Sequence, residues 1–312
     1  MIYRNFGDGP MTEATEQFPY GVGYMDGEYC AKEGMQVPVA DLGFLLSDTT
    51  YDALHVINGK FFRMEDHLDR WEQSITKRQF NSIPYDRDET REILMECVRR
   101  SGLRKSMVYL LATRGEALDG LKDLRQCQNR FLAWAVPYYS VIPDEKMEDG
   151  IDVCVSSVMR TPPDAIDPTV KNFARIDFSD ALLEAYEKGY DHAVLLDRDG
   201  NVTEGRGWNI FALHGGRLVS PDDGVLEGIT RRTVVELAQQ TNIKAEFGKL
   251  KADELRSADE VFMTSTAGGI MPIRKIDDHV VGNGTKGPVT QRLTDLYWEL
   301  HDDPDYNTPV DY

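Results

Sequence analysis

Four segments of the chain carry residue types that could bind a ligand or perform chemistry. Lys171, in "TVKN", follows a proline-rich stretch and precedes an apolar pattern with helical spacing, at the kind of loop position where functional groups often lie. Glu204 comes thirty-three residues later, directly before Gly-Arg-Gly. Thr230, in "GITRR", starts a predicted helix, and Thr266, in "TSTAGG", follows a predicted strand. Taken singly, these residues have ordinary explanations: a solvated lysine, an exposed turn acid, a helix N-cap and a plain loop.

Taken together, the four segments suit one cofactor. A helix N-terminus binds phosphate through its free N–H groups and dipole, and a threonine- and glycine-rich turn adds a hydroxyl and further N–H donors. A buried carboxylate can keep a heterocyclic nitrogen protonated, and a lysine can form a Schiff base with an aldehyde. Phosphate, ring nitrogen and aldehyde are the three handles of pyridoxal phosphate. The residue pattern is compatible with that cofactor, and the fold decides whether the segments meet.

The elements that would position these residues form two predicted domains. A chain of 312 residues with 41% hydrophobic content can bury a sizeable core, and its length favours two domains. We predict a smaller α+β domain over 1–139, a linker over 140–150, and a larger α+β domain over 151–312 that contains Lys171. Strands and helices interleave without a regular βαβ rhythm, which favours an α+β fold over a doubly wound sheet.

Local patterns predict the individual elements. Apolar residues with helical spacing indicate helices, alternating or continuous apolar runs indicate strands, and D-G and G-G turns indicate hairpins. The predicted helices are 64–80, 89–103, 178–190, 230–240, 252–257 and 288–301; the predicted strands are 131–139 and 151–158; the predicted hairpins lie within 192–205 and 209–221.

Composition excludes several classes of function. Lys and Arg number 35 against 53 Asp and Glu, a net charge of −18, which disfavours binding to nucleic-acid phosphates or an anionic membrane. No run approaches the length of a membrane-spanning helix, and the start "MIYRNFGDGP" lacks the pattern of a signal peptide. The four cysteines are far apart and form no CxxC motif. We therefore expect a cytoplasmic protein without a metal, nucleic-acid or membrane partner.

Longer segments carry a family resemblance. "HAVLLDRDGNVTEGRGWNIFAL", "GVLEGITRRTVVELA", "ADEVFMTSTAGGIMPI" and "GPVTQRLTDLYWEL" resemble the branched-chain aminotransferase-like family, the class IV pyridoxal phosphate enzymes. Within it, "TVKN" and "TAGGIMPI" are most similar to the (R)-selective amine transaminases. The resemblance runs from about Pro38 to Trp298. It implies a two-domain α+β fold of type IV, like D-amino acid aminotransferase, with the cofactor between the domains. It also implies a homodimer whose partner loops complete the active site.

The resemblance assigns a role to each candidate residue. Lys171 matches the Schiff-base lysine, and Glu204 matches the acid that pairs with the ring nitrogen. Arg70 matches a phosphate-binding arginine, although a helix-surface ion pair is the ordinary alternative. The other implied cofactor contacts are Arg175, Ile229, Thr230 and Thr266, and the implied substrate contacts are Leu46, Tyr51, Ala53, Met107, Tyr109, Arg125 and Ala267. Tyr51 and Ala53 could equally be strand-packing residues, and Arg125 matches a mobile arginine that accepts a substrate carboxylate.

Some positions depart from the family pattern. Leu46 stands where many (R)-amine transaminases have histidine, and Arg175 stands where they have tryptophan. Met107 and Tyr109 replace the usual phenylalanine and glutamate. Three roles stay open for Arg175: a contact near the ring oxygen, binding of a substrate acid group, or a pair with Asp177.

The resemblance implies a transaminase with a ping-pong mechanism. The expected donor is an (R)-amine or D-amino acid, and the expected acceptor is a keto acid such as pyruvate. The alternatives are a branched-chain or D-amino acid transaminase, an aminodeoxychorismate lyase, and a non-catalytic binding domain that keeps the fold.

Overall fold

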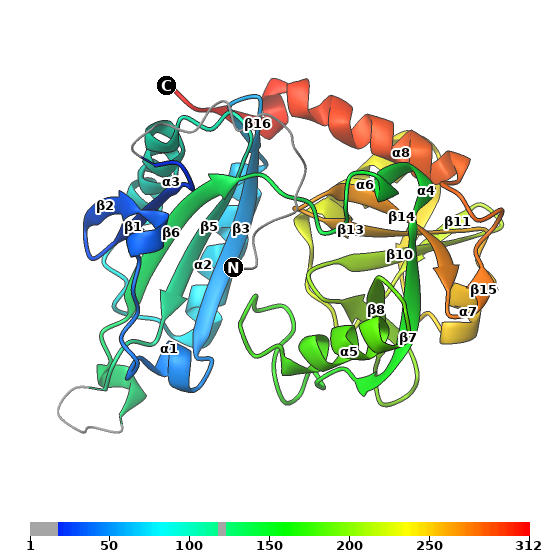
Figure 1. Cartoon of the computed structure of the whole chain (residues 1–312), viewed down its shortest axis with the longest axis horizontal. Coiled ribbons are helices and arrows are strands. Elements are labelled where there is room, and N and C mark those ends of the chain that lie inside the picture. Colours follow the sequence, from blue (N-terminus) through cyan, green and yellow to red (C-terminus); the bar gives the residue numbers. More distant parts are fainter. Residues whose placement is uncertain (1–17, 118–122) are drawn as a thin grey trace. The chain divides into compact units, whose positions relative to one another are not determined.

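The computed structural model describes residues 18–117 and 123–312, which form two compact units (Figure 1). Unit 1 consists of the described residues up to Tyr139 together with Val170–Ala174 and His301–Tyr312. Unit 2 consists of Ser140–Thr169 and Arg175–Leu300. The structure therefore groups Lys171 and the residues from His301 onward with the first unit, whereas the sequence pattern predicts them in the second domain. The opening residues, on which the expectation about a signal peptide depends, lie outside the described residues.

Unit 1 is built on a seven-stranded antiparallel sheet with the order β16-β4-β3-β5-β6-β1-β2. The strands are β1 (Val22–Met25), β2 (Glu28–Ala31), β3 (Thr49–Ile57), β4 (Lys60–Phe62), β5 (Ser106–Thr113), β6 (Arg130–Pro137) and β16 (Asn307–Pro309). The helices are α1 (Leu42–Leu45), α2 (Met64–Arg78) and α3 (Arg87–Ser101), with short 3-10 turns η1 (Lys32–Gly34), η3 (Leu124–Gln126) and η5 (Pro304–Tyr306). Thus β16, from the far end of the chain, forms one edge of this sheet.

One face of this sheet and the helices α2 and α3 share a single apolar core. Strand residues such as Leu54 and Leu110 pack with Leu68 and Trp71 of α2 and with Leu94 of α3. The helices predicted over 64–80 and 89–103 are confirmed as α2 and α3. Their apolar residues, at helical spacing, pack on the sheet. Since neighbouring residues of a strand point to opposite faces, the residues between these core positions lie on the other face.

Unit 2 is built on a nine-stranded mixed sheet with the order β12-β11-β10-β13-β14-β7-β8-β9, and β15 pairs with β14. The strands are β7 (Ile151–Met159), β8 (His192–Leu196), β9 (Val202–Gly205), β10 (Asn209–His214), β11 (Arg217–Ser220), β12 (Lys244–Phe247), β13 (Glu260–Ser265), β14 (Gly269–Ile276) and β15 (His279–Val280). The helices are α4 (Lys146–Asp149), α5 (Ile176–Glu187), α6 (Ile229–Gln240), α7 (Ala252–Arg256) and α8 (Pro288–Glu299), and η4 (Leu300–Asp302) follows α8. Mixed strands and helices confirm the predicted α+β class.

Both predicted hairpins of unit 2 are present. The first joins β8 to β9, with Leu196 opposite Val202. The second joins β10 to β11 through Gly215 and Gly216, whose φ angles of 53° and 82° are left-handed. Glycine adopts such angles without steric cost, so the G-G pair allows the tight turn. The predicted linker differs in one respect, because Lys146–Asp149 form the short helix α4.

Neither a membrane span nor a metal cluster is found in the described part of the chain. No helix among residues 18–117 and 123–312 has the length and hydropathy needed to cross a bilayer. The same residues contain no group of three or more His, Cys, Asp or Glu side chains suited to a metal ion.

Candidate active site

Lys171 is fixed to the sheet of unit 1 by its backbone. Its carbonyl oxygen accepts hydrogen bonds from the Tyr51 N–H (3.0 Å) and the Thr50 hydroxyl (2.9 Å), both on β3. The Lys171 Nζ atom lies 4.8 Å from the centre of the Tyr51 ring, a cation–π distance. That ring in turn packs on Phe173 at 4.9 Å between ring centres. The position of the amine therefore depends on β3, more than a hundred residues earlier in the chain.

Arg70, on α2, is held by a buried acid on the same strand. Its Nε and Nη2 atoms each donate to one carboxylate oxygen of Asp52, both at 2.8 Å, in a two-pronged ion pair. Both side chains are buried, so this is not the helix-surface ion pair that the sequence left as an alternative. The arrangement fixes the direction of the guanidinium group.

His67 completes this buried cluster. Its Nδ1 atom lies 2.8 Å from Asp52 Oδ1. Burial alone would raise the pKa of Asp52, but the charge of Arg70 and the contact with His67 lower that pKa overall. Burial also lowers the pKa of His67, and Asp52 opposes this only in part. Asp52 is therefore ionised and His67 neutral near pH 7, which makes Nδ1–H the donor.

Four predicted substrate residues share one face of the unit 1 sheet. Ala53 on β3 lies opposite Tyr109 on β5, and the next pairs on that face are Tyr51 with Leu111 and His55 with Met107. The Tyr109 ring stacks on Trp134 of β6, with centres 4.9 Å apart. We call this surface, with Tyr51, Ala53, His55, Met107, Tyr109 and Trp134, the aromatic face. It lies on the side of the sheet away from α2 and α3, so its residues are separate from the core beneath those helices.

The other two predicted substrate residues of unit 1 lie on exposed segments. Leu46, the C-cap residue of α1, is 66% exposed. The Arg125 side chain is 82% exposed, and its Nη2 atom donates to Asp123 Oδ2 at 2.7 Å. That contact lowers the pKa of Asp123 to about 2.

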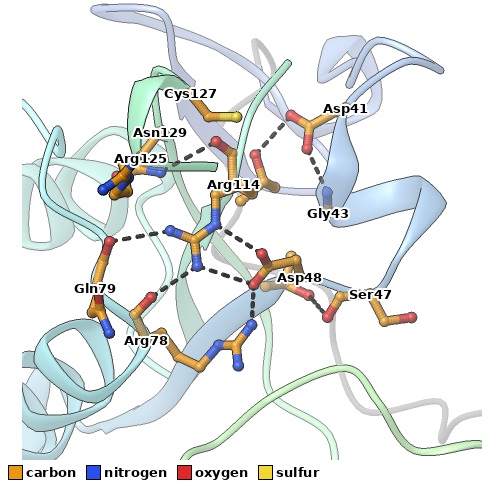
Figure 2. Close-up of polar contacts among 12 residues, drawn as sticks. Asp41, Gly43, Ser47, Asp48, Arg78, Gln79, Arg114, Arg125, Cys127 and Asn129 are labelled. Carbon is orange, nitrogen blue, oxygen red and sulfur yellow. Dashed lines mark hydrogen bonds and ion pairs between the residues drawn. The ribbon is translucent and has the colours of Figure 1, made fainter. Parts of the chain in front are cut away.

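Arg114, directly after β5, is a buried arginine with several partners. Figure 2 shows Arg114 between Asp48 and the last turn of α2. Its Nε donates to Asp48 at 2.7 Å, while its Nη atoms donate to the carbonyl oxygens of Arg78 (2.8 Å) and Gln79 (3.1 Å). The side chain of Arg78 reaches the same Asp48. Arg114 is therefore held by β3-side and α2-side partners, Asp48 and the carbonyl groups of Arg78 and Gln79, while Arg125 itself faces solvent.

Glu204, on β9 of unit 2, is a buried carboxylate with several donors around it. It is 4% exposed, so it is not an exposed turn acid. Its Oε2 atom accepts hydrogen bonds from Asn209 Nδ2 (3.0 Å) and from the Leu226 N–H (2.9 Å). Its Oε1 atom lies 3.4 Å from Arg160 Nη2. These contacts compensate the burial of the charge and fix the orientation of the carboxylate.

Asn209 links this carboxylate to the start of α6. Its amide nitrogen also donates to the Leu226 carbonyl oxygen at 2.9 Å. Its amide oxygen lies where a side chain of Gly228 would be, since a Cβ there would come within 2.1 Å of Asn209 Oδ1. Gly228 is the N-cap of α6 and supplies no side-chain cap to the first turn, which holds Ile229 and Thr230. A twelve-residue helix that starts this way favours an anion at its N-terminus.

The glycine-rich turn lies next to the same residues. Thr264, near the end of β13, is paired with Asn209, and Thr266 and Ala267 follow directly. The turn is held by Ser265, whose hydroxyl donates to the Gly207 carbonyl oxygen (2.9 Å) and accepts from the Ala267 N–H (3.2 Å). Unit 2 therefore brings together Glu204, the start of α6 and the Thr266 turn.

Arg175 precedes α5, and the structure adds Arg160 to this region. Arg175 Cζ lies 5.6 Å from the Phe178 ring centre. The ion pair of Asp177 is with Arg160, at 2.7 Å. Arg160, Asp52 and His67 were missed from the sequence, and Asp177 was named there only as a possible partner of Arg175. An arginine at the end of the alternating run "IDVCVSSVMR" and an aspartate within the apolar strand "TTYDALHV" are the signals that could have indicated two of them.

Each unit, taken by itself, holds donor groups that fit part of pyridoxal phosphate. Unit 1 offers an amine at Lys171 and a buried guanidinium at Arg70. Unit 2 offers a buried carboxylate and a helix N-terminus that has no side-chain cap, with threonine hydroxyls beside it. Burial lowers the pKa of the nearby Arg231 to about 10, with Glu204 opposing, so Arg231 remains a cation beside this set.

Comparisons with known proteins point to one family. The family model described as amino-transferase class IV matches residues 49–276. The branched-chain-amino-acid aminotransferase of Pseudomonas aeruginosa is 34% identical over 242 residues, covering 77% of this chain and 78% of that protein. Among solved structures, the Escherichia coli branched-chain amino acid aminotransferase has a TM-score of 0.89 at 27% identity, covering 94% of this chain and 100% of that chain. The enzyme of the same name from Thermobaculum terrenum, in its PLP form, has a TM-score of 0.84 at 26% identity, covering 94% and 99%.

Proposed function

Because the chain belongs to the class IV amino-transferase family, which uses pyridoxal 5'-phosphate, we propose that it transfers the amino group of a branched-chain L-amino acid to a 2-oxo acid. The names of the relatives support this substrate class. The single observation in the structure that supports it is the aromatic face, where the half-buried rings of Tyr51 and Tyr109 flank Ala53. Burial of an aliphatic side chain against such a surface is favourable.

Lys171 is the proposed catalytic residue. When bound, the cofactor supplies an electron-accepting ring that stabilises negative charge at the substrate α-carbon. Lys171 Nζ would hold the cofactor covalently, and the same amine would carry the proton to and from the substrate α-carbon. Proton transfer by a positioned side chain contributes roughly 10² to 10⁴ in rate. The backbone contacts of Lys171 with β3 hold the amine in place for this step.

Glu204 and the phosphate-binding residues hold the ring still. The Glu204 carboxylate, oriented by Asn209 and the Leu226 N–H, keeps the ring nitrogen protonated. Arg70, Thr230 and Thr266 bind the phosphate group, together with the first N–H groups of α6 near Ile229. In this proposal Asp52 acts through Arg70, because it sets the direction of the guanidinium.

The substrate carboxylate requires a further contact. Arg125 is the proposed partner of this carboxylate. Its guanidinium group makes a two-pronged contact with the Asp123 carboxylate in the structure, and it would make the same kind of contact with the substrate. Arg175, Tyr109, Leu46 and Ala267 are the other proposed contacts of cofactor or substrate.

A second candidate function is an (R)-selective amine transaminase. The segments "TVKN" and "TAGGIMPI" favour it, as does an apolar face that could accept an aryl group. Apolar pockets discriminate weakly between hydrophobic groups, by roughly 10- to 200-fold per methylene, so the two functions differ mainly in the handedness of the donor.

We also propose a homodimer in the cytoplasm. Three consecutive apolar side chains at the end of α1, Phe44, Leu45 and Leu46, are 70%, 57% and 66% exposed. Contiguous exposed apolar groups are typical of protein–protein contacts. The four free cysteines support a reducing compartment. Light scattering coupled to size-exclusion chromatography tests the dimer, and a monomeric holoenzyme contradicts it.

A donor screen tests the function. The holoenzyme is incubated with L-leucine, L-valine, D-alanine or racemic 1-phenylethylamine, each with 2-oxoglutarate or pyruvate, and products are resolved by chiral chromatography. Transfer from L-leucine with both amine enantiomers untouched supports the first function, and selective loss of the (R)-amine supports the second. Selective loss of the (S)-amine, or no transfer from any donor, contradicts both. Lys171→Ala is the control that should be inactive throughout.

A further inference from the structure

A buried chain of three charges runs from α5 to Glu204. Asp177, in the first turn of α5, lies next to Arg160, which follows β7 and reaches Glu204 on β9. All three side chains are less than 10% exposed. The three side chains comprise two acids and one base, and Glu204 also interacts with the charge of the nearby Arg231.

The central cation is shared unequally. Arg160 Nη1 donates to Asp177 Oδ2 at 2.7 Å, whereas Arg160 Nη2 lies 3.4 Å from Glu204 Oε1. A charge-assisted hydrogen bond has a length of about 2.7 to 2.9 Å, so Asp177 is the main partner and Glu204 the minor one. The backbone N–H of Arg160 donates to the Leu196 carbonyl oxygen at 2.9 Å. The Cζ atom of its guanidinium group lies 4.3 Å from the centre of the Phe178 ring. Backbone and ring together limit how far the guanidinium can move.

Asp177 is well placed to keep Arg160. Its Oδ2 atom also accepts the Thr161 N–H at 2.9 Å, and its Oδ1 accepts the Phe178 N–H at 2.8 Å. Burial raises the pKa of Asp177, but the Thr161 N–H and Arg160 lower that pKa overall. Its place at the N-terminus of α5 favours the ionised form as well.

We propose that Asp177 is a positioning residue that draws the charge of Arg160 away from Glu204, so that Glu204 keeps its negative charge for the ring nitrogen of the cofactor. This inference rests on the proposed role of Glu204. Without Asp177, the buried Arg160 would need another partner, and Glu204 is the acid within reach. A guanidinium paired fully with Glu204 would compete with the protonated ring nitrogen.

The size of the effect follows from the distances. Closing the Arg160–Glu204 gap from 3.4 Å to about 2.8 Å, at an effective dielectric constant of about 20, strengthens that pair by a factor of up to about six. Part of this added attraction between Arg160 and Glu204 is lost when the ring nitrogen of the cofactor binds Glu204. Removal of Arg160 should strengthen the contact between Glu204 and the ring nitrogen, because a cation that competes for Glu204 is then absent.

The test measures the ring nitrogen contact directly, by cofactor binding rather than by activity. Apo protein is titrated with pyridoxal 5'-phosphate and with its 1-deaza analogue, in which C–H replaces the ring nitrogen. The ratio of the two dissociation constants, analogue over cofactor, reports the contribution of that nitrogen. Asp177→Asn should lower the ratio by up to about sixfold, and Arg160→Gln should raise it. In the double variant the Asp177 change should have no further effect, because its effect acts through Arg160.

Controls separate the possible outcomes. Asp164→Asn, next to the exposed Arg198, should leave the ratio unchanged. An unchanged ratio in Glu204→Gln would overturn the role of Glu204 and this inference with it. A lowered ratio in Glu204→Gln with no change in Asp177→Asn, or an Asp177 effect that persists without Arg160, overturns this inference alone. Where Asp177→Asn does not fold, Asp177→Ser replaces it, since a hydroxyl can still accept the Thr161 N–H.

Discussion

Replacing Asp52 with asparagine should destabilise unit 1 strongly. The carboxylate is fully buried and receives two hydrogen bonds from Arg70 and one from His67, each at 2.8 Å. Asparagine keeps the shape but loses the charge and one acceptor oxygen, so the guanidinium of Arg70 is left buried without its counter-ion. Hydrogen bonds to charged groups contribute about 1.5 to 3 kcal/mol each. Loss of one partner of a buried ion pair costs about 3 to 5 kcal/mol, and we expect a loss of this size in the free energy of unfolding.

The pH dependence gives this prediction a distinctive form. The folded-state pKa of His67 is lowered, so its stabilising contribution is present above the ordinary value of 6.5 and is lost as pH falls through that value towards the folded pKa. In Asp52→Asn the folded pKa of His67 falls further, because Asp52 no longer opposes the effect of burial. The stability of the variant therefore continues to fall at pH values where that of the wild type has levelled off, by up to about 1.4 kcal/mol per pH unit.

The difference in unfolding free energy between the wild type and Asp52→Asn should become smaller again in stronger acid. The folded-state pKa of Asp52 is lowered, so its contribution in the wild type is present above the ordinary value of 3.8 and is lost as pH falls below it. The variant has no such group to lose. The difference in unfolding free energy should widen below neutral pH and shrink below about pH 4.

Urea unfolding at fixed protein concentration, followed by fluorescence from pH 8 to pH 3, measures this difference. Asp123→Asn is the matched control, since Asp123 makes a similar two-pronged contact with Arg125 at the surface. That control should leave the unfolding midpoint unchanged. A constant gap between wild type and Asp52→Asn over the whole pH range, or a gap as small as that of the control, would refute the reasoning.

Three further predictions concern the cofactor. Lys171→Ala should fold and still bind pyridoxal phosphate, but without the borohydride-reducible adduct; a pyridoxyl group mapped to another lysine would contradict the assignment. Arg70→Ala should weaken cofactor binding about 10- to 150-fold, from the loss of one charge-assisted contact; an unchanged dissociation constant in a titration of apo protein counts against its role. Gly228→Ala should weaken cofactor binding, because the new Cβ would lie 2.1 Å from Asn209 Oδ1, whereas the open site at Gly248 should tolerate alanine. Equal dissociation constants for these two alanine variants would show that the fit at Gly228 does not matter.

Much of the fold could be predicted because its signals are local. The G-G turn after His214, the apolar spacing around Leu68 and the proline before Val289 each indicate an element from a few neighbouring residues. The unit 2 part of the site was accessible for the same reason, since Glu204 and Thr230 lie in compact glycine-containing motifs.

The unpredicted parts depend on pairing between distant residues. The Asp52–Arg70 pair joins a strand to the helix packed on it, and the Asp177–Arg160 pair joins a helix to a strand end. Neither alternation nor helical spacing shows which buried acid meets which buried base. The place of Lys171 beside Thr50 depends on a contact across 121 residues, which no local pattern contains. Short motifs likewise do not decide the donor, and all the named relatives cited above are branched-chain enzymes.

Unit 1 is assembled from segments that are far apart in the chain, and this affects the order in which the protein can fold during synthesis. A ribosome releases the chain from its N-terminus, so Ser140–Leu300 emerge before His301–Tyr312 do. The strand β16, which pairs with β4, and His301, whose Nε2 lies 2.8 Å from that of His55, therefore become available only after the residues of unit 2. Unit 1 can therefore complete its sheet only after every residue of unit 2 has been synthesised. A nascent chain stalled a few residues short would lack an edge strand of the very sheet that holds Lys171.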